Sequence, residues 1–144
     1  MGPIEITTDI NRLDRDHLHR WLSGAYWSRG IPRPVLDRAM ANSICFGATE
    51  DGKTVGFARV VTDRATFAWL CDVFVDEGSR GAGVGKRLMD AVVAHPDLQG
   101  LRSFMLATRD AHGLYHRYGF RPLDEPERFM AIRHSADDLY GTTR

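Results

Sequence analysis

The stretch V-F-V-D-E-G-S-R-G-A-G-V-G, residues 73–85, indicates the fold of this chain more clearly than any other segment. An apolar strand pattern leads through a turn into alternate glycines at Gly81, Gly83 and Gly85, and then into a helical pattern. Glycine has no Cβ, so backbone N–H groups can crowd around a ligand. A helix N-terminus adds unpaired donors and partial positive charge. The stretch therefore predicts a pyrophosphate-binding turn between a strand and a helix.

Two well-known phosphate loops do not fit these residues. A Walker loop needs Gly-Lys followed by Ser or Thr, but Arg87 follows Lys86, and Arg80 stands where the first glycine belongs. The dinucleotide fingerprint G-x-G-x-x-G would need its third glycine at Lys86 or Leu88. A glycine-rich turn without a ligand is the remaining alternative. Three glycines that open a strong helix argue against it, because they are entropically costly.

Composition points to one domain spanning residues 1–144. Hydrophobic residues make up 43% of the chain, and 19 basic side chains balance 19 acidic ones. This balance argues against a nucleic acid or an anionic membrane as the main partner. The N-terminus lacks an apolar signal core and no apolar run is long enough to span a membrane, so we expect a soluble cytoplasmic protein. Cys45 and Cys71 lie in apolar runs, which predicts buried reduced thiols and no metal site.

Periodicity and turn signals divide the chain into alternating segments. Strands are expected at residues 4–7, 43–50, 53–62, 66–75, 101–107, 120–123 and 129–133. Helices are expected at residues 14–23, 34–42, 83–95 and 110–118. Asp14 is the expected N-cap of the first helix, and Asp51-Gly52 is a strong hairpin signal. The order predicts an α/β fold with a mixed, mostly antiparallel sheet of about seven strands flanked by four helices.

Two motifs resemble those of one enzyme family. Residues 80–85 read R-x-x-G-x-G, which resembles the acetyl-CoA loop of the GNAT N-acetyltransferases. Residues 111–120, A-H-G-L-Y-H-R-Y-G-F, resemble that family's A-x-x-L-Y-x-x-x-G-F helix. The order of elements from residue 43 onward also agrees. The resemblance covers essentially the whole chain and is weakest over residues 1–42.

The resemblance implies acetyl-CoA as the donor and no metal. Backbone amides of residues 80–85 would hold the pyrophosphate, and Lys86 would add positive charge. The backbone of residues 73–75 would pair with the pantetheine arm, and an N–H there would receive the thioester oxygen. Thr108 stands where the family often has Asn, touching the cofactor arm. The implied cofactor-binding residues are Val73, Phe74, Val75, Arg80, Gly81, Ala82, Gly83, Val84, Gly85, Lys86 and Thr108.

Tyr115 is the candidate proton donor. In the family motif this tyrosine donates to the CoA sulfur, as a phenol can do for a departing thiolate. The alternative is a core residue, because Tyr115 shares a helical stripe with Ala111, Leu114 and Tyr118.

Asp72 is the candidate base, because it is the one ionisable side chain within A-W-L-C-D-V-F-V. A structural carboxylate bonded to backbone or to an arginine is an equal alternative, and water can serve as the base in many family members. A turn centred on Arg64 would place Asp72 opposite Gly56 and Arg59 opposite Trp69. Stacking on Trp69 would satisfy Arg59, and contact with a substrate carboxylate is the alternative role.

Tyr26 and Trp27 lie in the loop between the first two helices, a region that roofs the acceptor site in the family. Two aromatic side chains there suggest an apolar or aromatic amine. The alternative is that they cover the core beneath the loop.

The leading hypothesis is an enzyme, an N-acetyltransferase that transfers acetyl directly to the amine of a small molecule. One alternative is a regulatory module that binds acetyl-CoA and a protein partner without turnover. Another is acetylation of a protein lysine or N-terminus. The sequence leaves open the acceptor amine, the choice of base and whether the chain forms a homodimer.

Overall fold

The computed structural model describes residues 2–141, which form one five-stranded sheet in the order β1-β2-β3-β4-β5. The strands are β1 (Ile4–Thr7), β2 (Ile44–Glu50), β3 (Lys53–Thr62), β4 (Phe67–Val75) and β5 (Ser103–Leu106). The first four pair antiparallel, whereas β5 runs parallel to β4. This parallel pair requires the long crossover that carries the helix after the glycines.

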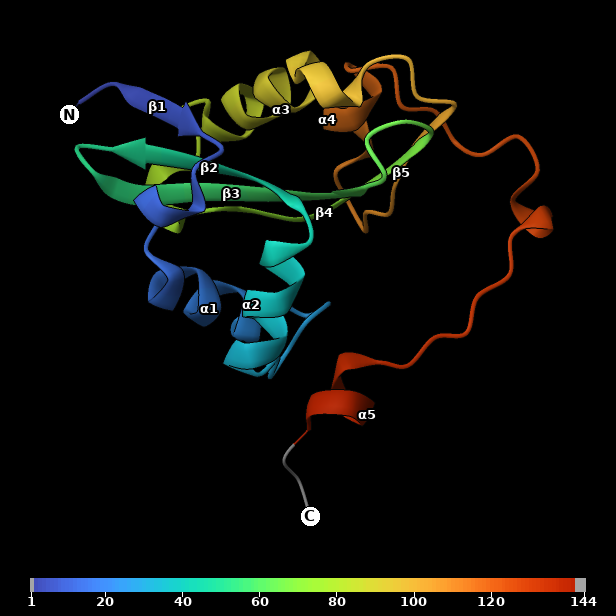
Figure 1. Ribbon diagram of the computed structural model, residues 1–144, viewed down its shortest axis with the longest axis horizontal. Coiled ribbons are helices and arrows are strands. Elements are labelled where there is room, and N and C mark those ends of the chain that lie inside the picture. Colours follow the sequence, from blue (N-terminus) through green and yellow to red (C-terminus); the bar gives the residue numbers. More distant parts are fainter. Residues whose placement is uncertain (1, 142–144) are drawn as a thin grey trace.

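Helices cover both faces of the sheet (Figure 1). One face carries α1 (Arg15–Gly24) and α2 (Arg33–Ala41), and the other carries α3 (Val84–Ala94) and α4 (His112–His116). A fifth helix, α5 (Ala136–Tyr140), lies near the end of the chain. No helix within residues 2–141 is long and apolar enough to span a bilayer.

Local signals set several of these boundaries. The Asp14 carboxylate accepts a hydrogen bond from the His17 N–H at 3.1 Å and caps α1, as predicted. Asp51 and Gly52 have φ values of +53° and +79°, which is the geometry of a two-residue hairpin turn. The predicted β2–β3 hairpin is therefore confirmed.

The core has two layers, one on each side of the sheet. Phe46 and Val60 pack with α3 on one side, whereas Cys45 and Phe57 pack with α1 and α2 on the other. This division follows from the alternation of side chains along β2 and β3. Gly56 is required for the close approach of α3, because a Cβ there would lie 2.6 Å from a methyl of Val84.

The predicted register between β3 and β4 is wrong. Arg59 lies opposite Cys71 instead of Trp69, and Gly56 pairs with Val75 instead of Asp72. The β3–β4 loop is wider than expected, because the Asp63 carboxylate accepts hydrogen bonds from three backbone N–H groups. A bulge then shifts the pairing between Phe57 and Arg59.

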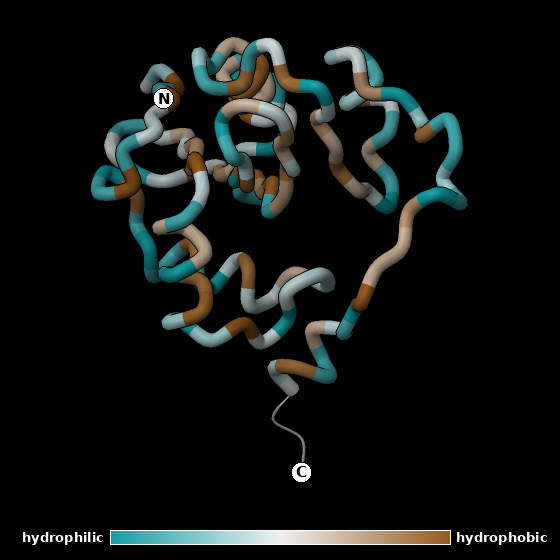
Figure 2. The backbone as a smooth tube through the Cα atoms, turned by 45° about the vertical axis from the view of Figure 1, so that its right-hand side comes forward, coloured by the Kyte–Doolittle hydropathy of each residue, from teal (hydrophilic) through white to brown (hydrophobic). Residues whose placement is uncertain are grey.

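The predicted count of elements also differs. Residues 2–141 contain five strands and five α-helices instead of about seven strands and four helices. The segments 120–123 and 129–133 form no sheet ladder within the described chain. Pro122 lacks a backbone donor, and 129–133 runs outside the body, where no strand lies beside it (Figures 1 and 2). We call residues 124–141 the C-terminal arm.

Candidate active site

The glycine loop, residues 80–85, leads from the end of β4 into α3. Gly81 and Gly83 adopt φ values of +87° and +83°, in the left-handed region that other residues rarely occupy. Gly83 is the N-cap of α3 and makes no side-chain cap bond. A Cβ on either glycine would meet no atom within 4 Å, so the loop faces open space. The first-turn N–H groups of α3 are thus available to an anion.

Neighbouring side chains hold this loop against the end of β4. The Arg80 Nε donates to the Val75 carbonyl oxygen at 3.2 Å, and its guanidinium carbon lies 5.9 Å from the centre of the Phe74 ring. Val84 is buried in the core, whereas Lys86 is exposed in the first turn of α3. The backbone from 80 to 86 is therefore anchored, and the Lys86 side chain extends into solvent.

The end of β4 presents an open backbone edge next to this loop. Pairing between β4 and β5 stops at Leu70 opposite Leu106, whereas Phe74 and Val75 still pair with β3. Among the described residues, no strand pairs with 73–75 on the β5 side. An extended ligand can bind such an edge through the main chain.

A cavity of about 540 Å³ lies beside this edge. It brings together residues from the loop after α1, from β4, from the segment after β5 and from α4. The predicted site residues that line it are Tyr26, Trp27, Asp72, Val73, Thr108 and Tyr115. Six residues from three distant parts of the sequence thus share one cavity, which we call the acceptor cavity.

Asp72 lies at the bulge of β4 with a φ of +55° and is buried. Its Oδ1 accepts from Trp27 Nε1 and its Oδ2 accepts from Arg59 Nε, both at 2.8 Å. The Arg59 guanidinium also donates to Ser43 Oγ at 3.0 Å. Burial lowers the pKa of Arg59, but the surrounding groups, chiefly the Asp72 carboxylate, together raise it more, so that this pKa lies above its ordinary value. The carboxylate therefore has one fixed partner at each oxygen.

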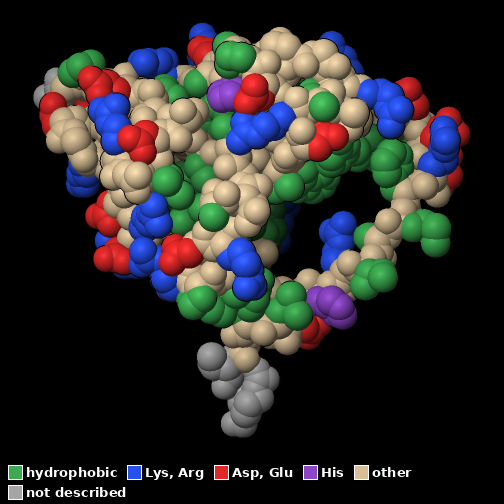
Figure 3. Space-filling model, in the orientation of Figure 1, with side chains coloured by type: hydrophobic (Ala, Val, Ile, Leu, Met, Phe, Trp, Pro, Cys, Tyr) green, Lys and Arg blue, Asp and Glu red, His purple; other side chains and the backbone are tan. Residues whose placement is uncertain are grey.

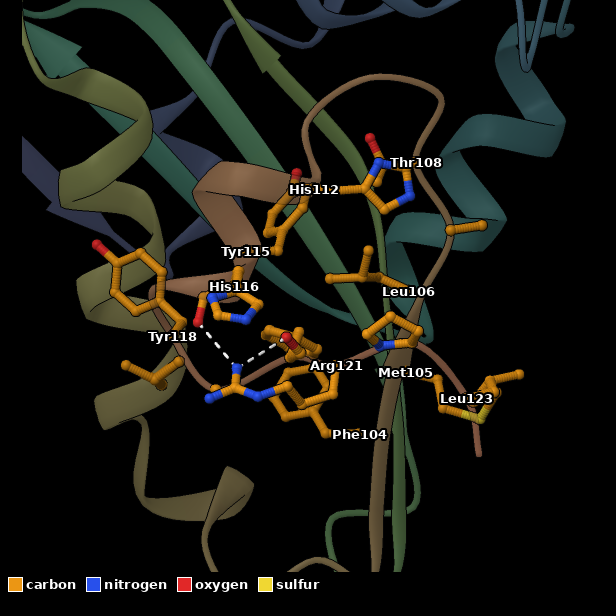
Figure 4. Close-up of a pocket in the computed structure, with 15 residues that line it drawn as sticks. Phe104, Met105, Leu106, Thr108, His112, Tyr115, His116, Tyr118, Arg121 and Leu123 are labelled. Carbon is orange, nitrogen blue, oxygen red and sulfur yellow. Dashed lines mark hydrogen bonds between the residues drawn. The ribbon is translucent and has the colours of Figure 1, made fainter. Parts of the chain in front are cut away.

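Tyr115 projects from α4 and is only 8% exposed. Burial raises the pKa of its phenol above the ordinary value. Its hydroxyl has no hydrogen-bond partner among residues 2–141 and points to the end of the site where Thr108 lies (Figure 4). Thr108 Oγ1 accepts from the Ala111 N–H at 3.1 Å and so orders the start of α4.

Tyr26 and Trp27 form an aromatic wall of the acceptor cavity. Their rings meet edge to face with centroids 5.1 Å apart, and both side chains are more than 40% exposed. The Arg109 guanidinium lies 3.6 Å above the Tyr26 ring. The wall therefore offers flat aromatic surface from Tyr26 and Trp27, with the positive charge of Arg109 beside it.

Two cationic residues that line the cavity were not among the predicted site residues. Arg109 follows Thr108 before α4, and Arg133 reaches the cavity from the C-terminal arm. Arg109 could have been identified from the sequence, because it directly follows Thr108, which is a predicted cofactor-binding residue. Arg133 could not, because its place depends on the path of the arm. Among residues 2–141 no group of three or more His, Cys, Asp or Glu side chains could hold a metal ion.

Comparison with known proteins shows that this chain is similar to acetyltransferases. Residues 41–122 match the family model of the acetyltransferase (GNAT) domain. A protein of Gibberella zeae that is named as an acetyltransferase is 29% identical over 137 residues, covering 79% of this chain and 76% of its own. The peptidyl-lysine N-acetyltransferase YiaC of Escherichia coli is 31% identical over 107 residues, covering 74% of this chain and 68% of its own.

A crystal structure from Xanthomonas campestris pv. campestris is similar over the full length. That protein, assigned to the GNAT family of acetyltransferases, is 51% identical to this chain. The two structures superimpose with a TM-score of 0.94 over 99% of each chain.

Proposed function

This chain belongs to the GNAT family of acetyltransferases, and from that premise we propose that it transfers the acetyl group of acetyl-CoA directly to the amine of a small molecule. The observation that carries the proposal is that the predicted proton donor, the open strand edge and the glycine loop follow one another in space. Tyr115 and Val73 line the acceptor cavity, Val73 begins the open edge of β4, and this edge leads into the glycine loop.

The donor side fits acetyl-CoA in three respects. The N-terminus of α3 and the glycine loop suit the pyrophosphate, and Lys86 adds a positive charge. The edge at residues 73–75 suits the amide-bearing pantetheine arm, which can pair with it as an added strand. Thr108 stands near the thioester end, where it orders α4.

On the acceptor side, the amine nitrogen attacks the thioester carbon, so that a C–N bond forms as the C–S bond breaks. A main-chain N–H of residues 73–75 donates to the carbonyl oxygen as negative charge develops there. The Tyr115 hydroxyl gives its proton to the departing sulfur. The proton of the amine leaves through water, and a proton from water restores the Tyr115 hydroxyl.

We prefer water to Asp72 as the base that removes the amine proton, because both oxygens of the Asp72 carboxylate already accept hydrogen bonds. Asp72 is instead a positioning residue that holds the Trp27 indole and the Arg59 guanidinium in place. Trp27 then forms part of the wall against which the acceptor lies.

The cavity favours a small amine with an apolar or aromatic body. Tyr26 and Trp27 offer flat surface, and the C-terminal arm brings Arg133 to its rim. A second candidate is a lysine side chain of a protein, because the relative YiaC is a peptidyl-lysine N-acetyltransferase.

A screen for CoA release tests the proposal. The chain is incubated with acetyl-CoA and a panel of aliphatic amines, aromatic amines, amino acids and lysine peptides, and free CoA is measured by chromatography. Sustained release with a small amine supports the proposal, and release only with peptides assigns the second candidate. Binding of acetyl-CoA without turnover across the panel contradicts both and leaves a regulatory module.

A further inference from the structure

Two arginine residues line the acceptor cavity without a counter-charge of their own. Arg109 comes from the segment after β5, and Arg133 comes from the C-terminal arm. Both residues are exposed, and neither guanidinium has an ion-pair or hydrogen-bond partner among residues 2–141. Like charges at one cavity repel each other, and an anion that binds there relieves this repulsion. The two arginines therefore favour an anionic ligand from outside the chain.

Stacking on an aromatic ring holds Arg109 in a fixed plane. Its guanidinium carbon lies 3.6 Å from the centre of the Tyr26 ring, and that ring meets the Trp27 ring edge to face. The ring covers one face of the guanidinium, whereas the N–H donors lie in its plane and stay available to an acceptor. A planar fork of donors matches the two oxygens of a carboxylate. Arg109 can thus bind such a group with little further loss of side-chain freedom.

The C-terminal arm places Arg133, and the arm is held at its far end. Asp137 forms an ion pair with Arg29 at 3.8 Å, and a Cβ on Gly30 would lie 3.2 Å from the Tyr140 carbonyl oxygen, so α5 packs closely on the loop after α1. Figure 3 shows an opening between the arm and the body, with Lys and Arg side chains at its border. The arm therefore brings a second positive charge to the acceptor cavity.

The carboxylates of the cavity do not neutralise these two arginines. Asp72 already forms an ion pair with Arg59 at 2.8 Å, so its charge is compensated. Asp110 also lines the cavity, but it is exposed and forms no ion pair with another described residue. Two arginines therefore face one free carboxylate, and the lining keeps one positive charge in excess. A single carboxylate on the ligand balances this charge.

The donor does not account for the positive charge. The phosphates of CoA are proposed to lie on the glycine loop, and none of residues 80–85 lines the acceptor cavity. The cavity is lined instead by Tyr115, beside which the thioester is proposed to react. The two arginines therefore face the acceptor.

We propose that the acceptor carries a carboxylate as well as its amine, and that Arg109 and Arg133 bind this carboxylate. At neutral pH an alkyl amine without an anion is a cation, which the two guanidinium groups repel, whereas an amino carboxylate has no net charge. The wall of Tyr26 and Trp27 contacts the body of the same molecule. This inference rests on the proposed function, whose acceptor it specifies.

The assignment also bears on two alternatives raised above. A lysine within a protein has its own carboxyl group in a peptide bond, so an acceptor with a free carboxylate favours a small molecule over a protein lysine. The sequence analysis considered Arg59 for contact with a substrate carboxylate. Because Asp72 engages the Arg59 guanidinium, that contact passes to Arg109 and Arg133.

Matched pairs of amines test the inference through CoA release. Phenylalanine is compared with phenylethylamine, and aminomethylbenzoate with benzylamine, so that the two members of a pair differ in the carboxylate alone. We expect kcat/KM to be at least about tenfold higher for the carboxylate member of one pair or both, as a charge-assisted contact supplies. Arg109→Gln and Arg133→Gln should each remove most of this preference.

Arg102→Gln is the matched control. Arg102 is exposed and directly precedes β5, at the other end of that strand from Arg109, and it does not line the acceptor cavity. The substitution removes the same charge from the chain, so it should keep the preference. A wild type without preference in either pair, or a preference that both cavity variants retain, overturns the inference.

Calorimetry on the chain saturated with CoA separates this inference from the proposed function. The carboxylate members should bind more tightly than their neutral partners, and Arg109→Gln should weaken only the carboxylate members. Equal turnover within each pair, or turnover of lysine peptides alone, overturns the inference and leaves acetyl transfer standing. Arginine-dependent binding of the carboxylate members without turnover of any amine contradicts acetyl transfer and supports the anion site. If no member binds and none is turned over, the inference fails.

Discussion

Tyr115 combines burial with a hydroxyl that no described residue engages, which suits a donor of one proton. We expect Tyr115→Phe to lower kcat by well over tenfold while the Kd for acetyl-CoA stays within about twofold, because only the transition state uses the hydroxyl. Burial raises the phenol pKa, so the group stays protonated and competent until high pH, and the alkaline fall of wild-type activity that its ionisation causes should come only there. Steady-state kinetics against pH, together with calorimetry, measure both effects.

Tyr118→Phe is the matched control, because Tyr118 lies three residues further along. Its hydroxyl donates to Asp90 Oδ1 at 2.8 Å, on the side of α3, and does not line the acceptor cavity. Its loss should leave kcat unchanged. Unchanged turnover in Tyr115→Phe would instead assign Tyr115 to the core.

We expect the Asp72–Arg59 ion pair to stabilise the fold and to hold the Trp27 indole in position. Their side chains are 8% and 17% exposed, so Asp72→Asn leaves a buried guanidinium without its counter-charge, at a cost of about 3 kcal/mol. Asn tolerates the positive φ at this position, so backbone strain adds little. Adding Arg59→Gln to Asp72→Asn removes the unpaired charge and should recover part of the lost free energy of unfolding. Urea denaturation of the wild type, the two single variants and the double variant measures this coupling. The pH profile of kcat in Asp72→Asn should keep its shape, and a shift to higher pH would make Asp72 the base.

At the scale of elements, the glycine loop makes a prediction about binding. Gly83→Ala places a side chain at φ +83°, with a strain of about 1 kcal/mol, and puts a methyl where the pyrophosphate is proposed to lie. We expect acetyl-CoA affinity to fall at least tenfold by calorimetry. Gly52→Ala is the matched control, because Gly52 has φ +79° and open space around it but lies in the β2–β3 hairpin. If both variants lose affinity equally, the loop is not the pyrophosphate site.

Elements set by local chemistry were predictable from the sequence. The Asp14 cap, the Asp51-Gly52 turn and the glycine loop each depend on residues within a few positions of one another. The register of β3 and β4 was not, because Asp63 widens the loop and a bulge at Asp72 shifts the pairing. The contact of Arg59 with Asp72 follows from that bulge, so the partner of Arg59 was missed along with the register.

At the scale of the whole molecule, the sequence did not indicate which segments pair with one another as strands. The pattern in 129–133 predicts a strand, and the structure has none there, because pairing depends on another strand that the sequence does not identify. The same holds for Arg133, whose arrival at the acceptor cavity depends on the path of the arm. The gathering of Tyr26, Trp27 and Tyr115 could be inferred only from the family resemblance.

The two thiols couple the stability of the whole fold to alkaline pH. Burial raises the pKa of Cys45 to about 11 and that of Cys71 to about 12, from an ordinary value of 9.0. The unfolded chain therefore releases these protons first, so their stabilising contribution is complete below pH 9.0 and is lost as pH rises toward the folded values. Each thiol should steepen the fall of unfolding free energy between pH 9 and 10 by up to about 1.4 kcal/mol per pH unit. Urea denaturation of wild type and the Cys45→Ala, Cys71→Ala variant, each referenced to its own value at pH 7, isolates this slope. Equal slopes would show that the thiols titrate normally and that their surroundings do not raise their pKa values.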